Sequence, residues 1–226
     1  MAYLPSMRGL APNLLLIILA LNTGWFVLYA ANLGARGLVA EDAEALSRVF
    51  AEGHFTANVA LAAHMIAGAV LTIGAPLQAT PMLRQRWPQA HRRLGYMLVG
   101  LAMVTGVGGL AYIAVLGTVG GWWMSLWFTI YGIAIIWSAA NTVYFALDKD
   151  PTRHFAWATR LVILAVGSWI YRMHYAIWFA LTDGVGSNPE FTGPFDQIQV
   201  FAFFIPYLLI AEWFLRRRRA GPRLAG

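Results

Sequence analysis

The sequence predicts an all-α fold, an integral membrane six-helix bundle with both termini cytoplasmic. Hydrophobic residues make up 59% of the 226 residues and charged residues only 12%, whereas soluble domains carry about 25% charged residues. Long apolar segments also recur along the chain, each about as long as is needed to cross ~30 Å of hydrocarbon. We therefore expect a single transmembrane helical-bundle domain over residues 1–226, with no soluble module.

Six apolar segments are the expected spans, at residues 11–31, 55–79, 92–117, 122–147, 155–182 and 197–215. Asp150 followed by Pro151 predicts an N-cap and the first position of the fifth helix. Between the first two spans, apolar residues recur at helical spacing over residues 40–50. This pattern predicts a short amphipathic helix on the membrane surface.

Basic residues predict the orientation of the bundle, because cytoplasmic loops of membrane proteins are enriched in Lys and Arg. The expected cytoplasmic side collects twelve of them: Arg8, Arg84, Arg86, Arg92, Arg93, Lys149, Arg153, Arg216, Arg217, Arg218, Arg219 and Arg223. The other side has only Arg36 and Arg48. We expect the lipid bilayer to be the main partner and the bacterial inner (cytoplasmic) membrane to be the location. No nucleic-acid motif accompanies the net charge of +6.

Several classes of site are excluded by residue content. The chain has no cysteine, which rules out thiolate metal sites and iron–sulfur clusters held by cysteine. There is no nucleophile motif and no HExxH, and Glu212 is the only carboxylate inside an expected span. A soluble hydrolase or metalloprotease is therefore not indicated.

Four histidines lie within or at the ends of the expected spans, and ionisable groups in such places are costly and usually functional. At ~1.5 Å per residue, His64 and His174 lie roughly 12–14 Å below the outer rim, whereas His91 and His154 lie near the inner rim. Paired imidazoles at one depth on different helices are the ligands that a bis-histidine haem b requires. Because His154 and His174 point to nearly opposite sides of one helix, the outer pair is the better candidate for haem iron.

Neighbouring residues fit the same haem hypothesis. Gly68 and Gly167 would leave room for a flat ring near the outer pair. Arg160 and Arg172 could pair with haem propionates. Structural alternatives stay open for each group, since buried histidines commonly bond to facing Asn, Gln or Ser side chains. An ion pair between Arg160 and Glu212, which lie at similar depth, is the favoured structural role of that arginine.

Four sequence segments resemble a known family, in this order: His64-Met65-Ile66-Ala67-Gly68, Gly74-Ala75-Pro76-Leu77-Gln78, His91-Arg92-Arg93-Leu94-Gly95-Tyr96 and His154-Phe155-Ala156-Trp157-Ala158-Thr159-Arg160. The family is a bacterial one of multi-pass membrane proteins of unknown function, and the resemblance covers residues 57–175. Phe155 stands where that family typically has Arg. A looser similarity links His91 and Gly95 to the transmembrane cytochrome b and ferric reductase superfamily. That similarity implies haem, but the fourth expected helix has no histidine.

The leading functional hypothesis is a haem b-binding electron-transfer protein or redox subunit, which would be an oxidoreductase-type carrier if it is an enzyme at all. It implies a redox partner or a membrane protein partner. The alternative is a non-enzymatic transporter, or an accessory or structural subunit of a larger membrane complex, in which the same His and Arg residues line a polar cavity. A chlorophyll-type pigment, which needs only one axial histidine, is a third possibility.

Overall fold

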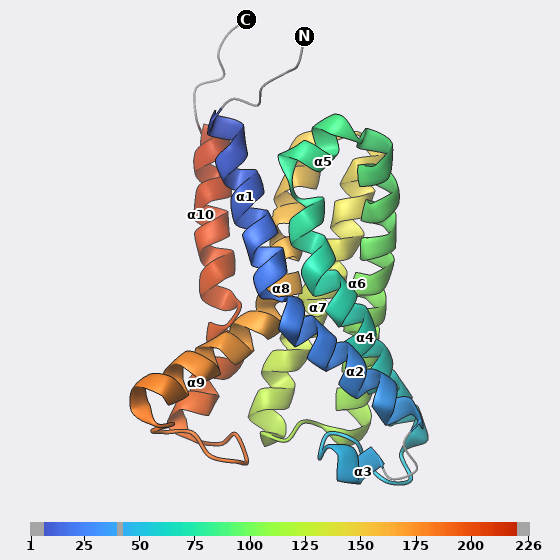
Figure 1. Ribbon diagram of the computed structural model, residues 1–226, viewed down its shortest axis with the longest axis vertical. Helices are drawn as coiled ribbons and strands as arrows, with labels where there is room; N and C mark the ends of the chain where they lie inside the picture. Colours follow the sequence, from blue (N-terminus) through green and yellow to red (C-terminus); the bar gives the residue numbers. More distant parts are fainter. Residues whose placement is uncertain (1–6, 40–42, 221–226) are drawn as a thin grey trace, which may run out of the picture.

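The computed structural model describes residues 7–39 and 43–220, and within these ranges the chain forms helices and no strand (Figure 1). The helices are α1 (Met7–Asn22), α2 (Gly24–Val39), α3 (Ala43–Leu46), α4 (Phe55–Gln78), α5 (Pro81–Arg86), α6 (Pro88–Leu116), α7 (Gly121–Leu147), α8 (Pro151–Thr182), α9 (Pro194–Ala202) and α10 (Ile205–Ala220). This confirms the all-α membrane fold.

Five of the described segments are long and apolar enough to cross a membrane, and α1 with α2 makes a sixth if that bent pair is one span. The expected first span at 11–31 therefore differs from the structure: the two helices meet at an angle of 40°. Thr23 lies at the bend, fully buried, and its hydroxyl donates to the carbonyl of Ala20 at 2.8 Å. Asn22, Thr23 and Gly24 interrupt the apolar segment at this point, and the prediction of one continuous span passed over this signal.

The helix expected at 40–50 is found at 43–46 and is wrong at 47–50. Residues 40–42 lie outside the described residues, and α3 covers only four residues. The chain then turns, with the N–H of Phe50 bonded to the carbonyl of Ser47 at 3.0 Å. Phe50 is 1% exposed and packs against Gly37 of α2. Burial of this one aromatic ring folds the segment back onto α2.

The last expected span, 197–215, consists of α9 and α10 joined at Phe203 and Phe204. Both phenylalanines are almost fully buried. Pro206 occupies the second position of α10, where the missing N–H of proline needs no intrahelical partner. The break thus turns two aromatic rings into the core and starts a new helix immediately after them.

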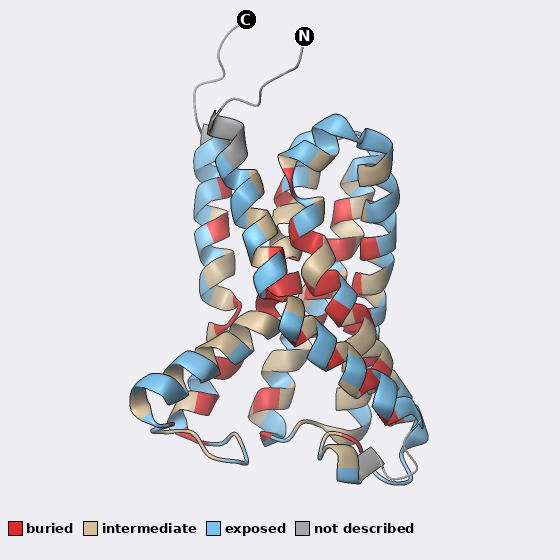
Figure 2. Cartoon of the chain, viewed as in Figure 1, coloured by how far each residue is buried: buried red, intermediate tan, exposed pale blue. Residues whose placement is uncertain are grey.

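Four helices form a ring around the core. In this ring α4 packs on α6, α6 on α7, α7 on α8, and α8 on α4. The shared core takes residues from all four helices and from the α9–α10 junction: Leu71, Ala75, Leu98, Ala102, Ile135, Ala139, Leu161, Leu164, Ala165, Phe203 and Phe204. Buried residues gather where these helices face one another, and outward faces are exposed (Figure 2). α6 and α8 are therefore diagonal in the ring.

Small residues allow the helices of the ring to approach closely. A Cβ added at Gly108 of α6 would lie 2.6 Å from the carbonyl oxygen of Ala60 in α4. One added at Gly106 would lie 3.3 Å from the carbonyl of Gly132 in α7. This is the close packing that glycines support in membrane helices.

The two ends of the bundle differ. α5 lies at one end, where α1 begins and α10 ends; α3 and the start of α9 lie at the other end (Figure 1). We call these the α5 end and the α3 end. Large apolar side chains such as Leu21, Trp137 and Leu181 are exposed on the outside, as expected for helices that face lipid.

Candidate functional site

His64, from α4, is bonded to the neighbouring helix. Its Nδ1 lies 2.7 Å from the carbonyl oxygen of Thr105 in α6. Because a carbonyl only accepts, Nδ1 carries the proton in this bond. A Cβ at Gly109 would lie only 2.8 Å from the same nitrogen, so the glycine gives the imidazole its place. The half-buried ring thus joins α4 to α6.

His174, from α8, has hydrogen-bond partners at both ring nitrogens. Nδ1 lies 3.1 Å from Oε1 and 3.0 Å from Nε2 of Gln199 in α9, and Nε2 lies 2.8 Å from the hydroxyl of Tyr207 in α10. The Tyr207 ring is also stacked on the imidazole, with centroids 6.0 Å apart. To bind a metal, His174 would have to give up one of these bonds.

The expected outer pair is thus held by different neighbours, His64 by α6 and His174 by α9 and α10. Gly68 and Gly167 lie beside protein side chains. A Cβ at Gly68 would be 3.4 Å from Cγ2 of Thr105, and one at Gly167 would be 2.7 Å from the Tyr131 hydroxyl. These bonds match the structural alternative that the sequence left open, in which buried histidines bond to polar groups of facing helices.

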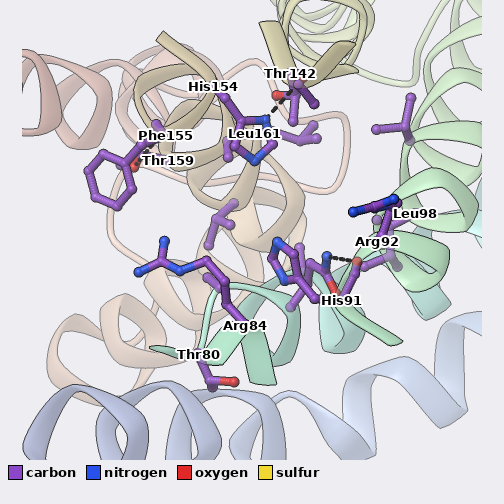
Figure 3. A pocket seen from close by; sticks show the side chains of 18 of the residues that line it. Thr80, Arg84, His91, Arg92, Leu98, Thr142, His154, Phe155, Thr159 and Leu161 are labelled. Atoms are coloured by element: carbon purple, nitrogen blue, oxygen red, sulfur yellow. Dashed lines mark hydrogen bonds between the residues drawn. The ribbon is translucent and has the colours of Figure 1, made fainter. Parts of the chain in front are cut away.

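The two inner histidines line one cavity of about 740 Å³ near the α5 end of the bundle. His91 comes from the first turn of α6 and His154 from the first turn of α8, and their rings point toward the same space (Figure 3). The volume is within the range of about 300–1,000 Å³ that is typical of cofactor and small-molecule sites. Most of the lining is apolar, with core residues such as Leu71, Leu98 and Leu161.

The hydrogen bonds of His154 determine its tautomer. Its Nδ1 lies 2.9 Å from the carbonyl oxygen of Thr142 in α7, so Nδ1 donates and the neutral ring keeps its lone pair on Nε2. Metal-ligating histidines are commonly oriented in this way: one ring nitrogen donates to a backbone carbonyl, and the other is available to bind the metal.

His91 is held through its backbone. The side-chain amide of Gln78, at the end of α4, donates to the His91 carbonyl at 2.6 Å. Gly95 makes room for this amide, since a Cβ there would lie 3.0 Å from its nitrogen. Two polar atoms beside the cavity, Nδ1 of His91 and Oε1 of Gln78, are buried and have no hydrogen-bond partner among the residues that the structure describes. Such orphaned atoms are rare in folded proteins and mark this place for a ligand.

Positive charge surrounds the same cavity. Arg84 of α5, Arg92 of α6 and Arg218 of α10 line it, and the described lining residues include no carboxylate. Guanidinium groups pair well with carboxylates and phosphates. The cavity therefore combines an apolar interior, two imidazoles from opposite helices, and cationic groups suited to an anionic substituent.

The two arginines inside α8 have different environments. Arg160 forms an ion pair with Glu212 of α10, with 2.5 Å between Nη2 and Oε1, and lies over the Trp157 ring at 4.4 Å. This confirms the predicted structural pair. Arg172 donates to the carbonyl of Ser168 at 3.0 Å and has no ion-pair partner among the described residues. Neither arginine lines the cavity.

Sequence reasoning missed the cavity residues Arg84 and Thr142. Thr142 had a readable signal, because α7 and α8 form a helical hairpin with its turn near residues 148–150. Residues at similar distances on either side of such a turn face each other, as Thr142 and His154 do. Arg84 had no such signal, because its position depends on how α5 folds over the end of the bundle.

A family model described as predicted membrane protein (DUF2306) matches residues 61–215, more than half of the chain and all four of these histidines. The chain belongs to this family. No curated protein and no solved structure matches it. In this DUF2306 member, no group of three or more His, Cys, Asp or Glu side chains that could hold a metal ion occurs in the part of the chain that the structure describes. A haem requires fewer protein ligands, since one or two axial groups are enough.

Proposed function

We propose that this membrane protein binds one haem b in the cavity at the α5 end, with His91 and His154 as axial ligands, and acts in electron transfer. The observation that carries the proposal is the diagonal position of α6 and α8 in the ring of four helices. Two imidazoles on diagonal helices can approach a flat macrocycle from opposite faces. Their shared cavity of about 740 Å³ supports this arrangement.

The residues around the cavity fit such a group. The bond between His154 and the Thr142 carbonyl leaves Nε2 as the ligating atom. The leucines and alanines of the lining would exclude water from the macrocycle, and Arg84 or Arg218 would pair with propionates. A bound haem would supply one-electron redox chemistry. The chain's own part is to hold the two imidazoles, shield the ring and neutralise its carboxylates.

In this proposal His64 and His174 are structural, because protein groups already bond to them. The predicted outer haem would require His174 to release Gln199 or Tyr207. The excess of basic residues near the α5 end supports placing that end in the cytoplasm, with the protein in the bacterial inner membrane. The haem would then lie near the cytoplasmic face.

The deciding experiment is the visible spectrum of the purified protein, oxidised and then reduced with dithionite, after expression with haem supplied. We expect Soret and α bands of low-spin haem at one haem per chain. His91→Ala and His154→Ala should remove most of the Soret absorbance. His64→Ala and His174→Ala, as matched controls, should keep it. Circular dichroism would establish that each variant remains helical.

Two results would refute the assignment. A colourless wild-type protein would rule out haem, and loss of colour only in the His64 and His174 variants would move the haem to the outer pair.

A second candidate function is a non-enzymatic transporter that binds an anionic small molecule in the same cavity. The observation that favours it is the presence of Arg84, Arg92 and Arg218 with no carboxylate among the described lining residues. A colourless protein whose thermal stability rises with an anionic ligand, and whose Arg84→Gln variant does not respond, would support this function.

A further inference from the structure

Arg172 is a charged residue inside the membrane-spanning helix α8. Helical side chains lean toward the N-terminus of their helix, and the Arg172 guanidinium follows this rule by bonding to the carbonyl of Ser168 at 3.0 Å. At ~1.5 Å per residue, Ser168 lies roughly 26 Å from the start of α8 and roughly 21 Å from its end. The guanidinium therefore points away from the nearer membrane surface.

No negative charge in the described part of the chain balances this arginine. The ion pairs found there join Arg153 to Asp150 and Arg160 to Glu212. Tyr29, Tyr131, Tyr171 and His64 lie close enough to Arg172 to interact with it electrostatically, and none of them is a carboxylate. Charged groups inside membranes are almost always paired or face a polar path.

An aromatic surface adjoins the charge. The guanidinium lies over the ring of Phe26 in α2, 4.6 Å from its centroid. Trp169, one helical turn before Arg172, packs against the hydrophobic cluster that contains Phe26. Its indole Nε1 is buried and has no hydrogen-bond partner among the described residues. Tyr29, one turn after Phe26, is 51% exposed. We call Arg172, Trp169, Phe26 and Tyr29 the mid-membrane arginine site.

The arginine residue itself is exposed, so the site opens to the surroundings of the bundle, which at this depth are lipid. A guanidinium has five N–H donors, and within the described residues Arg172 makes one hydrogen bond, to the carbonyl of Ser168. An arginine with unused donors, an unpartnered indole N–H and adjacent aromatic rings together favour a ligand with an acceptor oxygen and an apolar body.

We propose that the mid-membrane arginine site binds the carboxylate of a single-chain, lipid-soluble molecule such as a fatty acid. Charge complementarity favours a carboxylate, because a planar guanidinium and a carboxylate match in shape and charge. A phospholipid phosphate is less suited to this depth, because the glycerol and both ester groups would have to leave the membrane surface with it, whereas a fatty acid has only its carboxylate to bring in. This site does not depend on the haem proposal and uses none of its residues.

A second copy of the chain is not the expected occupant. Glu212, the carboxylate expected within a span, is already paired with Arg160. An Asp or Glu on a helix of another protein is also disfavoured, because the Arg172 guanidinium lies against α2 and the backbone of α8. A short Asp or Glu side chain would need its own helix to enter between them, whereas a flexible acyl chain reaches the site from the lipid.

The test uses the full chain in nanodiscs of zwitterionic lipid, with dibromostearic acid as the probe that quenches tryptophan fluorescence. Outward-facing tryptophans such as Trp25 and Trp137 give a non-saturable background of quenching. Above this background we expect a saturable component that unlabelled stearic acid reverses and that Trp169→Phe removes. The methyl ester of the probe, which has the same chain and no charge, should bind at least tenfold more weakly. Arg172→Gln should weaken binding of the acid by a similar factor, as loss of a charge-assisted hydrogen bond requires.

Arg48→Gln is the matched control, because Arg48 lies outside the helices and contacts Phe191; its binding should equal that of the wild type. If Arg172→Gln does not fold, Arg172→Lys, which keeps the charge but loses the planar fork, should bind with intermediate affinity. Equal quenching by the acid and its ester in the wild type would overturn the proposal. So would unchanged affinity in a folded Arg172→Gln variant.

Discussion

The ion pair between Arg160 and Glu212 offers a direct test of what holds α10 to the bundle. Replacing Glu212 by Gln keeps the side-chain shape but leaves Arg160 without its counter-charge. The two side chains are 18% and 32% exposed, respectively. Removal of one partner from a buried ion pair costs about 3–5 kcal/mol. Because Glu212 is nearly one-third exposed, we expect a loss of about 3 kcal/mol in unfolding free energy, at the lower end of that range.

Removal of both charges should cost less than removal of one. Buried pairs often exchange for apolar residues of similar volume at little cost. In the double variant Arg160→Met/Glu212→Met, the remaining loss is the cation–π contact of Arg160 with Trp157, at 4.4 Å, worth about 0.5–1 kcal/mol. Each single variant, Arg160→Met or Glu212→Met, should cost about 3 kcal/mol. Together the two single losses exceed the loss in the double variant by about 5 kcal/mol, which is the coupling energy expected from the double-mutant cycle.

Unfolding by sodium dodecyl sulfate in mixed micelles, followed by circular dichroism, would measure these free energies. Arg153→Met/Asp150→Asn is a suitable control cycle, because Arg153 is 62% exposed and its pair with Asp150 is 3.4 Å long. Surface pairs contribute about 0–1 kcal/mol. A coupling energy for Arg160 and Glu212 no larger than in this control would refute the reasoning, since it would mean that water already screens the pair.

Four further substitutions test the packing by the same unfolding assay. Gly167→Ala should cost about 1–3 kcal/mol, because its Cβ would lie 2.7 Å from the Tyr131 hydroxyl. Gly68→Ala should be nearly neutral, because its Cβ would make an ordinary 3.4 Å contact. Equal losses in the two variants would contradict this reasoning. Asp196→Asn should cost about 2–3 kcal/mol, because the fully buried carboxylate accepts four hydrogen bonds. Wild-type stability of this variant would show that the segment between α8 and α9 does not need the charge. Thr72→Val should cost about 1 kcal/mol, since the hydroxyl bonds to an α8 carbonyl at 2.9 Å, and a stabilised variant would exclude this bond as a helix–helix link.

Two predictions from the sequence are confirmed by the structure, one based on composition and one based on depth along the helices. The all-α membrane fold follows from the length and apolar content of the segments. The pairing of Arg160 with Glu212 follows because both lie at similar depth and Glu212 is the only carboxylate expected inside a span. Charges inside a membrane have few possible partners, so a single coordinate was enough to identify this one.

Two other features depend on tertiary packing, which a single sequence does not show. The bend at Thr23 coincides with the short interruption Asn22-Thr23-Gly24, and hydrophobicity averaged over the whole segment merges α1 and α2. The return of Phe50 onto Gly37 depends on a tertiary contact, which shortens the surface helix that periodicity predicts. At Phe50, packing overrides the local pattern of the sequence.

The histidines illustrate why depth alone does not identify a ligand pair. Depth groups His64 with His174 and His91 with His154, but the order of helices in the ring determines which side chains share a space. The other bonds of each ring then determine what it can bind. His174 has protein partners at both nitrogens, whereas the one recorded bond of His154 leaves Nε2 to a ligand. On these grounds the inner pair, which depth and helical angle ranked second, is the better place to look for a cofactor.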